Sequence, residues 1–110
     1  MVGIDFCVAD DKKEAAFSTK CVKMEGKVHD YLLARGFWGS FQLLIRLDQY
    51  SDKLFSIQEI NQLIEVCEAL QATCRQPIEI DLKVRTFAEE LKALCLEALK
   101  LNKLVFAAGD

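Results

Sequence analysis

Apolar residues occupy every second position at the start of the chain. They are Val2, Ile4, Phe6 and Val8, and smaller or polar residues lie between them. Because neighbouring side chains of an extended chain point to opposite faces, this alternation predicts a strand with one buried face. A polar turn at residues 10–14 follows, and a second alternation over residues 16–23 predicts another strand that closes a hairpin. Good helix formers at residues 12–16 leave a helix open as the alternative for this second segment.

Farther along the chain, apolar residues recur every three or four positions, which is the spacing of a helix with one buried face. The helices predicted from this spacing cover residues 25–35, 40–50, 56–74 and 86–102. Two of them begin at a capping box, in which a hydroxyl accepts a hydrogen bond from the backbone amide of a glutamate three positions later. The boxes are Ser56 with Glu59 and Thr86 with Glu89.

Two further segments are predicted to be extended. Pro77 ends the preceding helix, and apolar residues then alternate with charged ones as far as Val84, which favours a short edge strand or a loop over residues 77–84. The helix over residues 86–102 is expected to end at Asn102. The apolar residues 104–106 then predict a final strand beside the first hairpin.

The combined pattern predicts an α+β fold in a single domain over residues 1–110. It contains an N-terminal hairpin, a short C-terminal strand added to the hairpin, and about four helices. A chain with 52% apolar residues and one proline is long enough to bury one core. An all-α bundle is the alternative, since residues 1–23 and 40–50 are open to either secondary structure.

The cysteines and the single histidine indicate structural roles. The five cysteines stand at positions 7, 21, 67, 74 and 95. Their number is odd, they contain no C-x-x-C pair, and they occupy places where small apolar residues fit, so reduced and packed thiols are expected. His29 has no cysteine at the spacing of a zinc site. No cofactor is expected.

Charge and hydropathy restrict the partners of the protein. The net charge is −3, and the whole acidic excess lies in residues 56–110, which hold nine acids and six bases. This balance argues against binding of nucleic acid through bulk electrostatics. No apolar run is long enough to span a bilayer, and the N-terminus lacks the pattern of an export signal. We therefore expect a cytoplasmic protein that binds neither nucleic acid nor membrane.

Residues 48–59 resemble the loop of a helix-loop-helix calcium site. Acids occupy loop positions one, five and twelve, and the seventh position would contribute a backbone carbonyl. The corresponding candidate ligands are Asp48, Asp52, Leu54 and Glu59. Tyr50 replaces an oxygen ligand at position three, and Lys53 replaces the usual glycine at position six. Glu59 is also required by the capping box, so calcium binding is an alternative hypothesis.

No catalytic pattern emerges from the sequence. It contains no ordered Ser-His-Asp set, no glycine-rich phosphate loop and no H-E-x-x-H motif. We therefore expect a protein that is not an enzyme and nominate no catalytic residue. A small enzyme with an unrecognised site is the third hypothesis.

Three segments carry a resemblance to known proteins. They are G-I-D-F-x-V-x-D at residues 3–10, the acidic loop followed by S-I-Q-E, and F-A-E-E-L-x-x-L-C-x-x-A-L with a later L-V-F at residues 87–106. Together they resemble a loosely defined group of small bacterial proteins, some of which are similar to immunity proteins that neutralise a toxin made by the same cell. The resemblance implies a non-enzymatic protein that binds another protein.

The acidic C-terminal half suggests how such a protein would bind. Many toxins that cut nucleic acid have basic active sites, and an acidic surface can imitate the charge of their substrate. The predicted partner is therefore a protein, for example a basic toxin domain. The predicted contact residues are the helical acids Glu65, Glu68, Glu89, Glu90 and Glu97, together with Trp38, since tryptophan concentrates binding energy when it anchors an interface.

Overall fold

The structure is a computed structural model that describes residues 3–18, 21–35 and 52–109. Its elements in chain order are β1 (Gly3–Val8), α1 (Lys12–Phe17), β2 (Cys21–Glu25), α2 (Gly26–Arg35), β3 (Lys53–Phe55), α4 (Ile57–Thr73), α5 (Glu79–Lys100) and β4 (Val105–Gly109). Strands and helices both contribute, so the predicted α+β fold is confirmed and the all-α alternative is wrong. The helix predicted at 40–50 lies outside the described residues.

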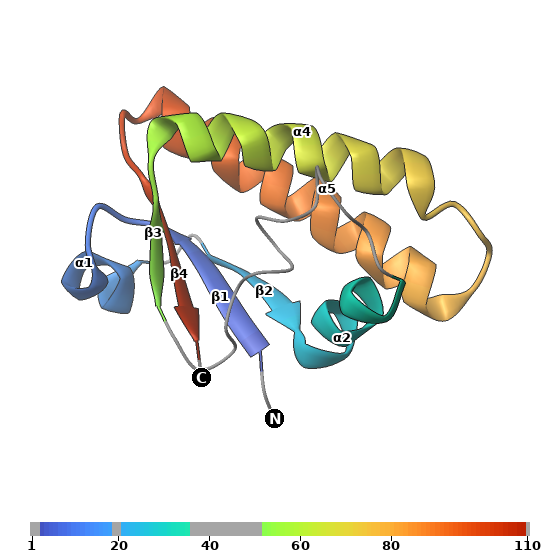
Figure 1. Cartoon of the computed structure of the whole chain (residues 1–110). Helices are drawn as coiled ribbons and strands as arrows, with labels where there is room; N and C mark the ends of the chain where they lie inside the picture. Colours follow the sequence, from blue (N-terminus) through green and yellow to red (C-terminus); the bar gives the residue numbers. More distant parts are fainter. Residues whose placement is uncertain (1–2, 19–20, 36–51, 110) are drawn as a thin grey trace.

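The four described strands form one antiparallel sheet in the order β2-β1-β4-β3. Strand β1 is central, and it pairs with β2 on one side and with β4 on the other. In the first pairing Cys7 stands opposite Cys21, and in the second Val8 stands opposite Val105. The predicted N-terminal pairing and the predicted C-terminal strand are therefore both present (Figure 1).

The connection between β1 and β2 differs from a simple hairpin. Residues 12–17 form helix α1, and the second strand begins at Cys21, so the strand predicted from residue 16 is wrong over its first part. The helix forms because Asp11 is its N-cap, with Oδ1 accepting a hydrogen bond of 2.7 Å from the Glu14 amide. The helix-forming residues thus determine the structure there, and the alternating pattern applies only from Cys21.

Helices α4 and α5 lie side by side as a layer on one face of the sheet, while α1 and α2 lie at opposite ends of it (Figure 1). The core between the layers contains Phe6 of β1, whose ring centroid is 6.1 Å from that of Phe55 and 5.9 Å from that of Phe87. Fully burying one such side chain contributes about 1.5–3 kcal/mol. None of the described helices is both long enough and apolar enough to cross a membrane.

Helix α4 begins as predicted. The Ser56 hydroxyl accepts a hydrogen bond of 3.3 Å from the Glu59 amide, and the Glu59 carboxylate accepts one of 3.1 Å from the Ser56 amide. Both bonds of the capping box are present, so two backbone N–H groups that lack partners inside the helix are satisfied. The predicted helix 56–74 is confirmed as Ile57–Thr73.

Helix α5 begins earlier than predicted. It starts at Glu79 after the N-cap Ile78, so the extended segment at 77–84 is wrong. Thr86 lies within the helix, and the capping box predicted there is wrong as well. The alternation of apolar and charged residues suggested a strand, but these residues lie on a helix. Val84 belongs to the buried stripe of that helix, whereas Leu82 is 56% exposed.

Helix α5 ends where the sequence predicts. Leu101 is its C-cap, and the next residue, Asn102, has a φ of 57°. Asparagine adopts this left-handed conformation more readily than most residues, and it commonly follows the end of a helix. The Lys103 amide donates a hydrogen bond of 2.8 Å to the Ala98 carbonyl. The chain is thereby directed from α5 into β4.

Candidate functional site

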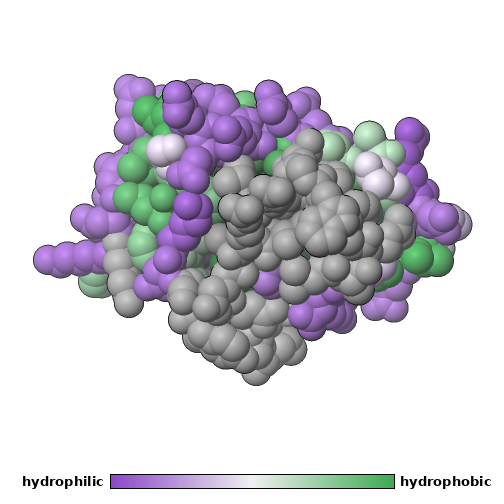
Figure 2. Space-filling model, in the orientation of Figure 1, coloured by the Kyte–Doolittle hydropathy of each residue, from purple (hydrophilic) through white to green (hydrophobic). Residues whose placement is uncertain are grey.

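The acids predicted to contact a partner occupy the two long helices. Glu65 and Glu68 of α4 are exposed, as are Glu89 and Glu90 of α5, whereas Glu97 is half-buried. Trp38, the sixth predicted contact residue, lies outside the described residues. Figure 2 shows hydrophilic side chains along the outer surface of α4.

Three of these acids lie in one row across the helix layer. Glu65 and Glu68 are three residues apart on α4 and therefore neighbours on its surface. The Glu68 carboxylate lies 3.1 Å from the Lys92 ammonium of α5. Glu89 precedes Lys92 by three residues and is its neighbour on α5. We call Glu65, Glu68, Glu89 and Lys92 the acidic row, which carries three negative charges and one positive charge.

The other two acids belong to a different part of the surface. Glu90 lines a groove of about 250 Å³ between α5 and β2, whose lining also includes Lys23 and Lys83. Glu97 follows Glu90 by seven residues, two helical turns farther along α5. Lysines offset the negative charge around Glu90. The five predicted acids therefore do not form a single patch.

The predicted calcium loop has a strand within it. Residues 53–55 form β3, and Leu54 stands opposite Phe106 of β4. The Glu59 carboxylate accepts the capping hydrogen bond from Ser56 and also lies 3.0 Å from the Lys53 ammonium. The hydrogen bond from the Ser56 backbone, followed by the nearby lysine, lowers the pKa of Glu59.

These contacts give Glu59 partners from its own chain. Asp52 is exposed just before β3, and Asp48 lies outside the described residues. Within residues 3–18, 21–35 and 52–109, no three His, Cys, Asp or Glu side chains are grouped so that they could hold a metal ion. Calcium binding by the complete loop stays an alternative hypothesis.

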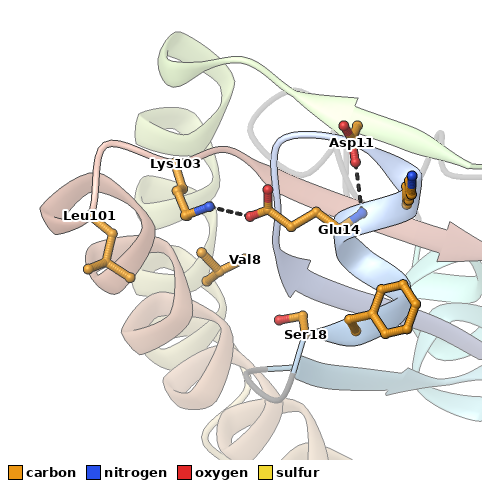
Figure 3. A pocket seen from close by; sticks show the side chains of 8 residues that line it. Val8, Asp11, Glu14, Ser18, Leu101 and Lys103 are labelled. Atoms are coloured by element: carbon orange, nitrogen blue, oxygen red, sulfur yellow. Dashed lines mark hydrogen bonds and ion pairs between the residues drawn. The ribbon is translucent and has the colours of Figure 1, made fainter.

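A groove that the sequence did not predict lies beside α1. It has a volume of about 560 Å³, and its lining combines apolar and charged residues (Figure 3). The lining residues are Val8, Asp11, Lys13, Glu14, Phe17, Ser18, Leu101 and Lys103. Residues from both ends of the chain meet there, so no local sequence pattern could indicate it. Its most exposed apolar residue, Phe17, is 80% exposed.

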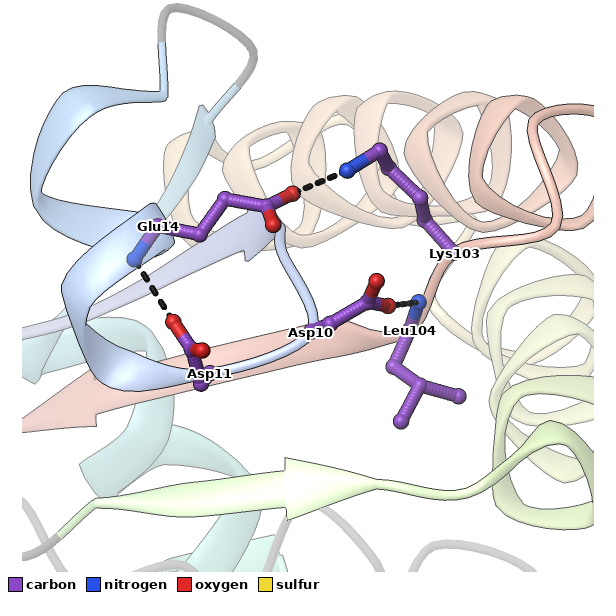
Figure 4. A network of polar contacts seen from close by, with 5 residues as sticks. All are labelled: Asp10, Asp11, Glu14, Lys103 and Leu104. Carbon is purple, nitrogen blue, oxygen red and sulfur yellow. Dashed lines mark hydrogen bonds and ion pairs between the residues drawn. The ribbon is translucent and has the colours of Figure 1, made fainter.

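Polar contacts connect α1 and the turn before it to the segment between α5 and β4 (Figure 4). The Lys103 ammonium forms an ion pair with the Glu14 carboxylate, which raises the pKa of Lys103. The Asp10 carboxylate accepts a hydrogen bond of 3.0 Å from the Leu104 amide. The Ala9 amide donates one of 2.9 Å to the Leu104 carbonyl. These bonds fix the entry into β4 beside α1.

The cysteines do not all have the predicted state. Cys7 and Cys21 form a disulfide between β1 and β2, so the prediction of reduced thiols is wrong for this pair. The sequence did not indicate the pair because the two cysteines are fourteen positions apart, with α1 between them. The remaining cysteines, which are Cys67, Cys74 and Cys95, are thiols outside any disulfide and are buried, as predicted. Burial raises the pKa of both Cys67 and Cys95 to about 12.

Comparison with known proteins adds no relative. The sequence matches no protein-family model, and it has no significant match among curated proteins or solved structures. The resemblance to immunity proteins therefore stays a prediction. What defines this protein is its α+β fold, with two long helices as a layer on an antiparallel sheet, and its function is inferred from its own residues.

Proposed function

We propose that this protein is a non-enzymatic cytoplasmic protein that binds another protein, and most concretely an immunity-type inhibitor of a basic bacterial toxin domain. The observation that carries the proposal is the acidic row, in which the Glu68–Lys92 ion pair joins the two helices and Glu65 and Glu89 are the helical neighbours of its members. The negative excess of residues 56–110 has the same sign. A basic toxin domain is the class of partner that such a surface attracts.

The helix layer supports this proposal because it holds the acids on a rigid scaffold. Leu63 of α4 and Leu91 of α5 are fully buried in the core beneath the layer. Acids on regular helices have a backbone that is already ordered, so a partner that binds them does not have to order a loop. The Lys92 ammonium between Glu68 and Glu89 restricts the row to partners whose cations match this arrangement.

The expected mechanism is competition by charge. The acidic row attracts the basic active site of the toxin, increases the rate of encounter and covers the surface that would hold nucleic acid. Inhibition should therefore weaken as salt concentration rises, because salt screens exposed charges over a distance of about 8 Å at physiological ionic strength. Neither the acids nor Lys92 needs to perform chemistry in this role.

The test uses the products of the genes that neighbour this one in the native host. Each product is expressed alone and with this chain, and growth is compared. A toxic product that this chain neutralises would support the proposal, and the affinity of the purified pair is then measured at low and high salt. If no neighbouring product is toxic, or if none is bound, the proposal fails.

Charge variants then test the acidic row itself. E65Q/E89Q removes two negative charges and should weaken binding at least about tenfold at low salt, whereas K92Q removes the opposing cation and should strengthen it. A16K/Q76K changes the net charge by the same amount as E65Q/E89Q at exposed positions outside the row. Equal effects of E65Q/E89Q and this control would show that net charge, and not the row, determines binding.

A further inference from the structure

The Cys7–Cys21 disulfide is placed at the boundary between the sheet and α1. It joins the last residue pair of the β1–β2 ladder, with the two Cα atoms 4.2 Å apart. In an antiparallel ladder, side chains approach most closely at pairs that exchange no backbone hydrogen bonds, where the Cα atoms are about 4.5 Å apart. The two cysteines therefore meet without a change in the pairing of the strands.

The disulfide closes the segment that contains α1. Val8 and Ala9, at the start of this segment, are buried beside β4, whereas the contacts of residues 10–18 with the end of the chain are polar. The Glu14–Lys103 ion pair and the hydrogen bond from Leu104 to Asp10 are examples, and both involve exposed or half-buried groups. Phe17, at the end of α1, contributes little packing because it is 80% exposed. The disulfide therefore adds a covalent restraint to the β1–β2 ladder at the base of this segment.

The two cysteine residues differ in their exposure to solvent. Cys7 is 5% exposed, whereas Cys21 is an exposed residue at the start of β2. Lys23 lies two positions farther along the strand, on the same face, and is also exposed. A thiol in solution therefore reaches the disulfide at Cys21, beside a positive charge that favours an attacking thiolate.

The remaining described cysteines are excluded from this chemistry by burial. Cys67, Cys74 and Cys95 are all fully buried among apolar residues of the core. Cys7 lies on the other face of β1 from Phe6 and Val8, which belong to that core. Breaking the disulfide should therefore leave the packing between the sheet and the helix layer unchanged.

We propose that Cys7 and Cys21 form a reversible thiol–disulfide switch that controls how firmly α1 is held against the end of α5. A small thiol such as glutathione, as its thiolate, attacks the Cys21 Sγ. The S–S bond breaks, its electron pair leaves with the Cys7 Sγ, and that sulfur takes up a proton. A second thiolate then attacks the sulfur of the small thiol in this mixed disulfide, and the Cys21 Sγ leaves with the electron pair and takes up a proton. Two small thiols thus become one small disulfide, and the protein gains two thiols.

The two states differ in the freedom of α1. In the disulfide state the segment is closed at both ends, and the groove between α1 and Leu101 keeps its shape. In the dithiol state the β1–β2 ladder alone closes the base of the segment, while the polar contacts with Lys103 and Leu104 hold α1 to the C-terminal part, so α1 opens more often and the groove widens. This switch is independent of the acidic row and of any toxin.

The experiment follows both the thiols and α1. The whole chain is equilibrated in buffers with different ratios of reduced to oxidised glutathione, blocked with N-ethylmaleimide and analysed by mass spectrometry. Labelling at Cys7 and Cys21 should rise together from none to both as the buffer becomes more reducing. In parallel, hydrogen exchange in residues 10–18 should become at least about tenfold faster, while exchange in α5 stays constant.

Two variants control the experiment. C7S/C21S should show fast exchange in residues 10–18 in every buffer, and C67A, which removes a buried thiol, should keep the transition of the unmodified chain. The proposal is overturned if Cys7 and Cys21 are labelled even in fully oxidised buffer, or if exchange in residues 10–18 is the same in both states. The unmodified chain compared in two buffers decides the matter even if C7S/C21S fails to fold.

Discussion

Tyr31 of α2 donates a hydrogen bond to Asp81 of α5, with 2.5 Å between the phenolic oxygen and Oδ1. Asp81 is only 1% exposed, and its Oδ2 accepts a second bond, of 3.1 Å, from the Gln76 amide. The Gln76 carbonyl is bonded in turn, because it accepts a hydrogen bond of 3.3 Å from Arg85. Asp81 and Arg85, four residues apart on α5, thus bind the backbone amide and the backbone carbonyl of Gln76 in the turn between α4 and α5.

Removal of the phenolic donor should destabilise the protein. Tyr31→Phe deletes one hydrogen bond to a buried carboxylate, and such a loss costs about 1–3 kcal/mol. The free energy of unfolding, measured by urea denaturation, should fall by this amount.

Asn61→Ala is the matched control for this prediction. It deletes an exposed hydrogen bond of 3.2 Å from the Asn61 side chain to the Ile57 carbonyl. Exposed substitutions of this kind change the free energy of unfolding by less than about 0.5 kcal/mol. A Tyr31→Phe protein as stable as the Asn61→Ala protein would contradict the structural role given to Asp81.

The two capping boxes predicted from the sequence should respond differently to alanine. Ser56→Ala removes a real N-cap and should lower the free energy of unfolding by about 1 kcal/mol. Thr86→Ala places a better helix former at an exposed position inside α5, so it should leave stability unchanged or raise it slightly. Thermal or urea denaturation of both variants measures the difference. Equal losses in the two proteins would place a helix start at Thr86 after all.

These two boxes show how far local sequence signals determine the fold. Ser56 begins a helix because the residues just before it belong to β3 and the chain must change direction there. Thr86 has the same pattern, but the residues before it are already helical. Asp81 gains its hydrogen bonds from Tyr31 and Gln76, so tertiary contacts favour a helix over the alternating pattern. Such contacts join residues that are 50 apart in the chain, and a local pattern does not contain them.

The candidate sites depend on tertiary structure even more strongly. The helical stripes correctly placed Glu65, Glu68 and Glu89 on solvent-exposed surfaces. The contact between Glu68 and Lys92 depends on how α4 packs against α5, and no spacing within one helix reveals it. The Cys7–Cys21 disulfide likewise depends on the register of β1 and β2. The three-residue strand β3 is too short for alternation to be recognised in the sequence.

The lowered pKa of Glu59 predicts a dependence of stability on acid. The capping hydrogen bond and Lys53 favour the charged carboxylate in the folded protein, so the folded pKa lies below the ordinary value of 4.5. The stabilisation is therefore complete above that value and is lost as the pH falls through the folded pKa. Glu59→Gln keeps a side chain that can complete the capping box but cannot ionise. The unmodified protein should lose more stability than Glu59→Gln on acidification, and parallel pH profiles of melting temperature would refute the assignment.

Calcium should not stabilise the protein, because the Glu59 carboxylate already has a capping hydrogen bond and an ion pair with Lys53. A site that binds calcium would raise stability by RT ln(1 + [L]/Kd), an effect of about 2.7 kcal/mol at a hundredfold excess over Kd. We expect the melting temperature to be the same with millimolar calcium and with a chelator. Lys53→Gly restores the usual glycine at loop position six and removes the cation that competes for Glu59. This variant is the one in which calcium binding is easiest to detect, so it serves as the sensitive control. A rise in melting temperature for the unmodified chain would favour the calcium hypothesis.

The buried thiols of Cys67 and Cys95 should react only when the protein opens. Burial raises the pKa of each to about 12, so at pH 8 only about one thiol in ten thousand is ionised, and the thiolate is the reactive form. Labelling with iodoacetamide, followed by peptide mass spectrometry, should therefore be slow at both positions in the native protein. It should become fast in concentrated urea, which exposes the thiols and restores their ordinary pKa.

Because opening of the core controls the reaction, Tyr31→Phe should label faster than the unmodified protein if global unfolding exposes these thiols. Rapid native labelling of Cys67 would mean that the α4–α5 contact opens without global unfolding.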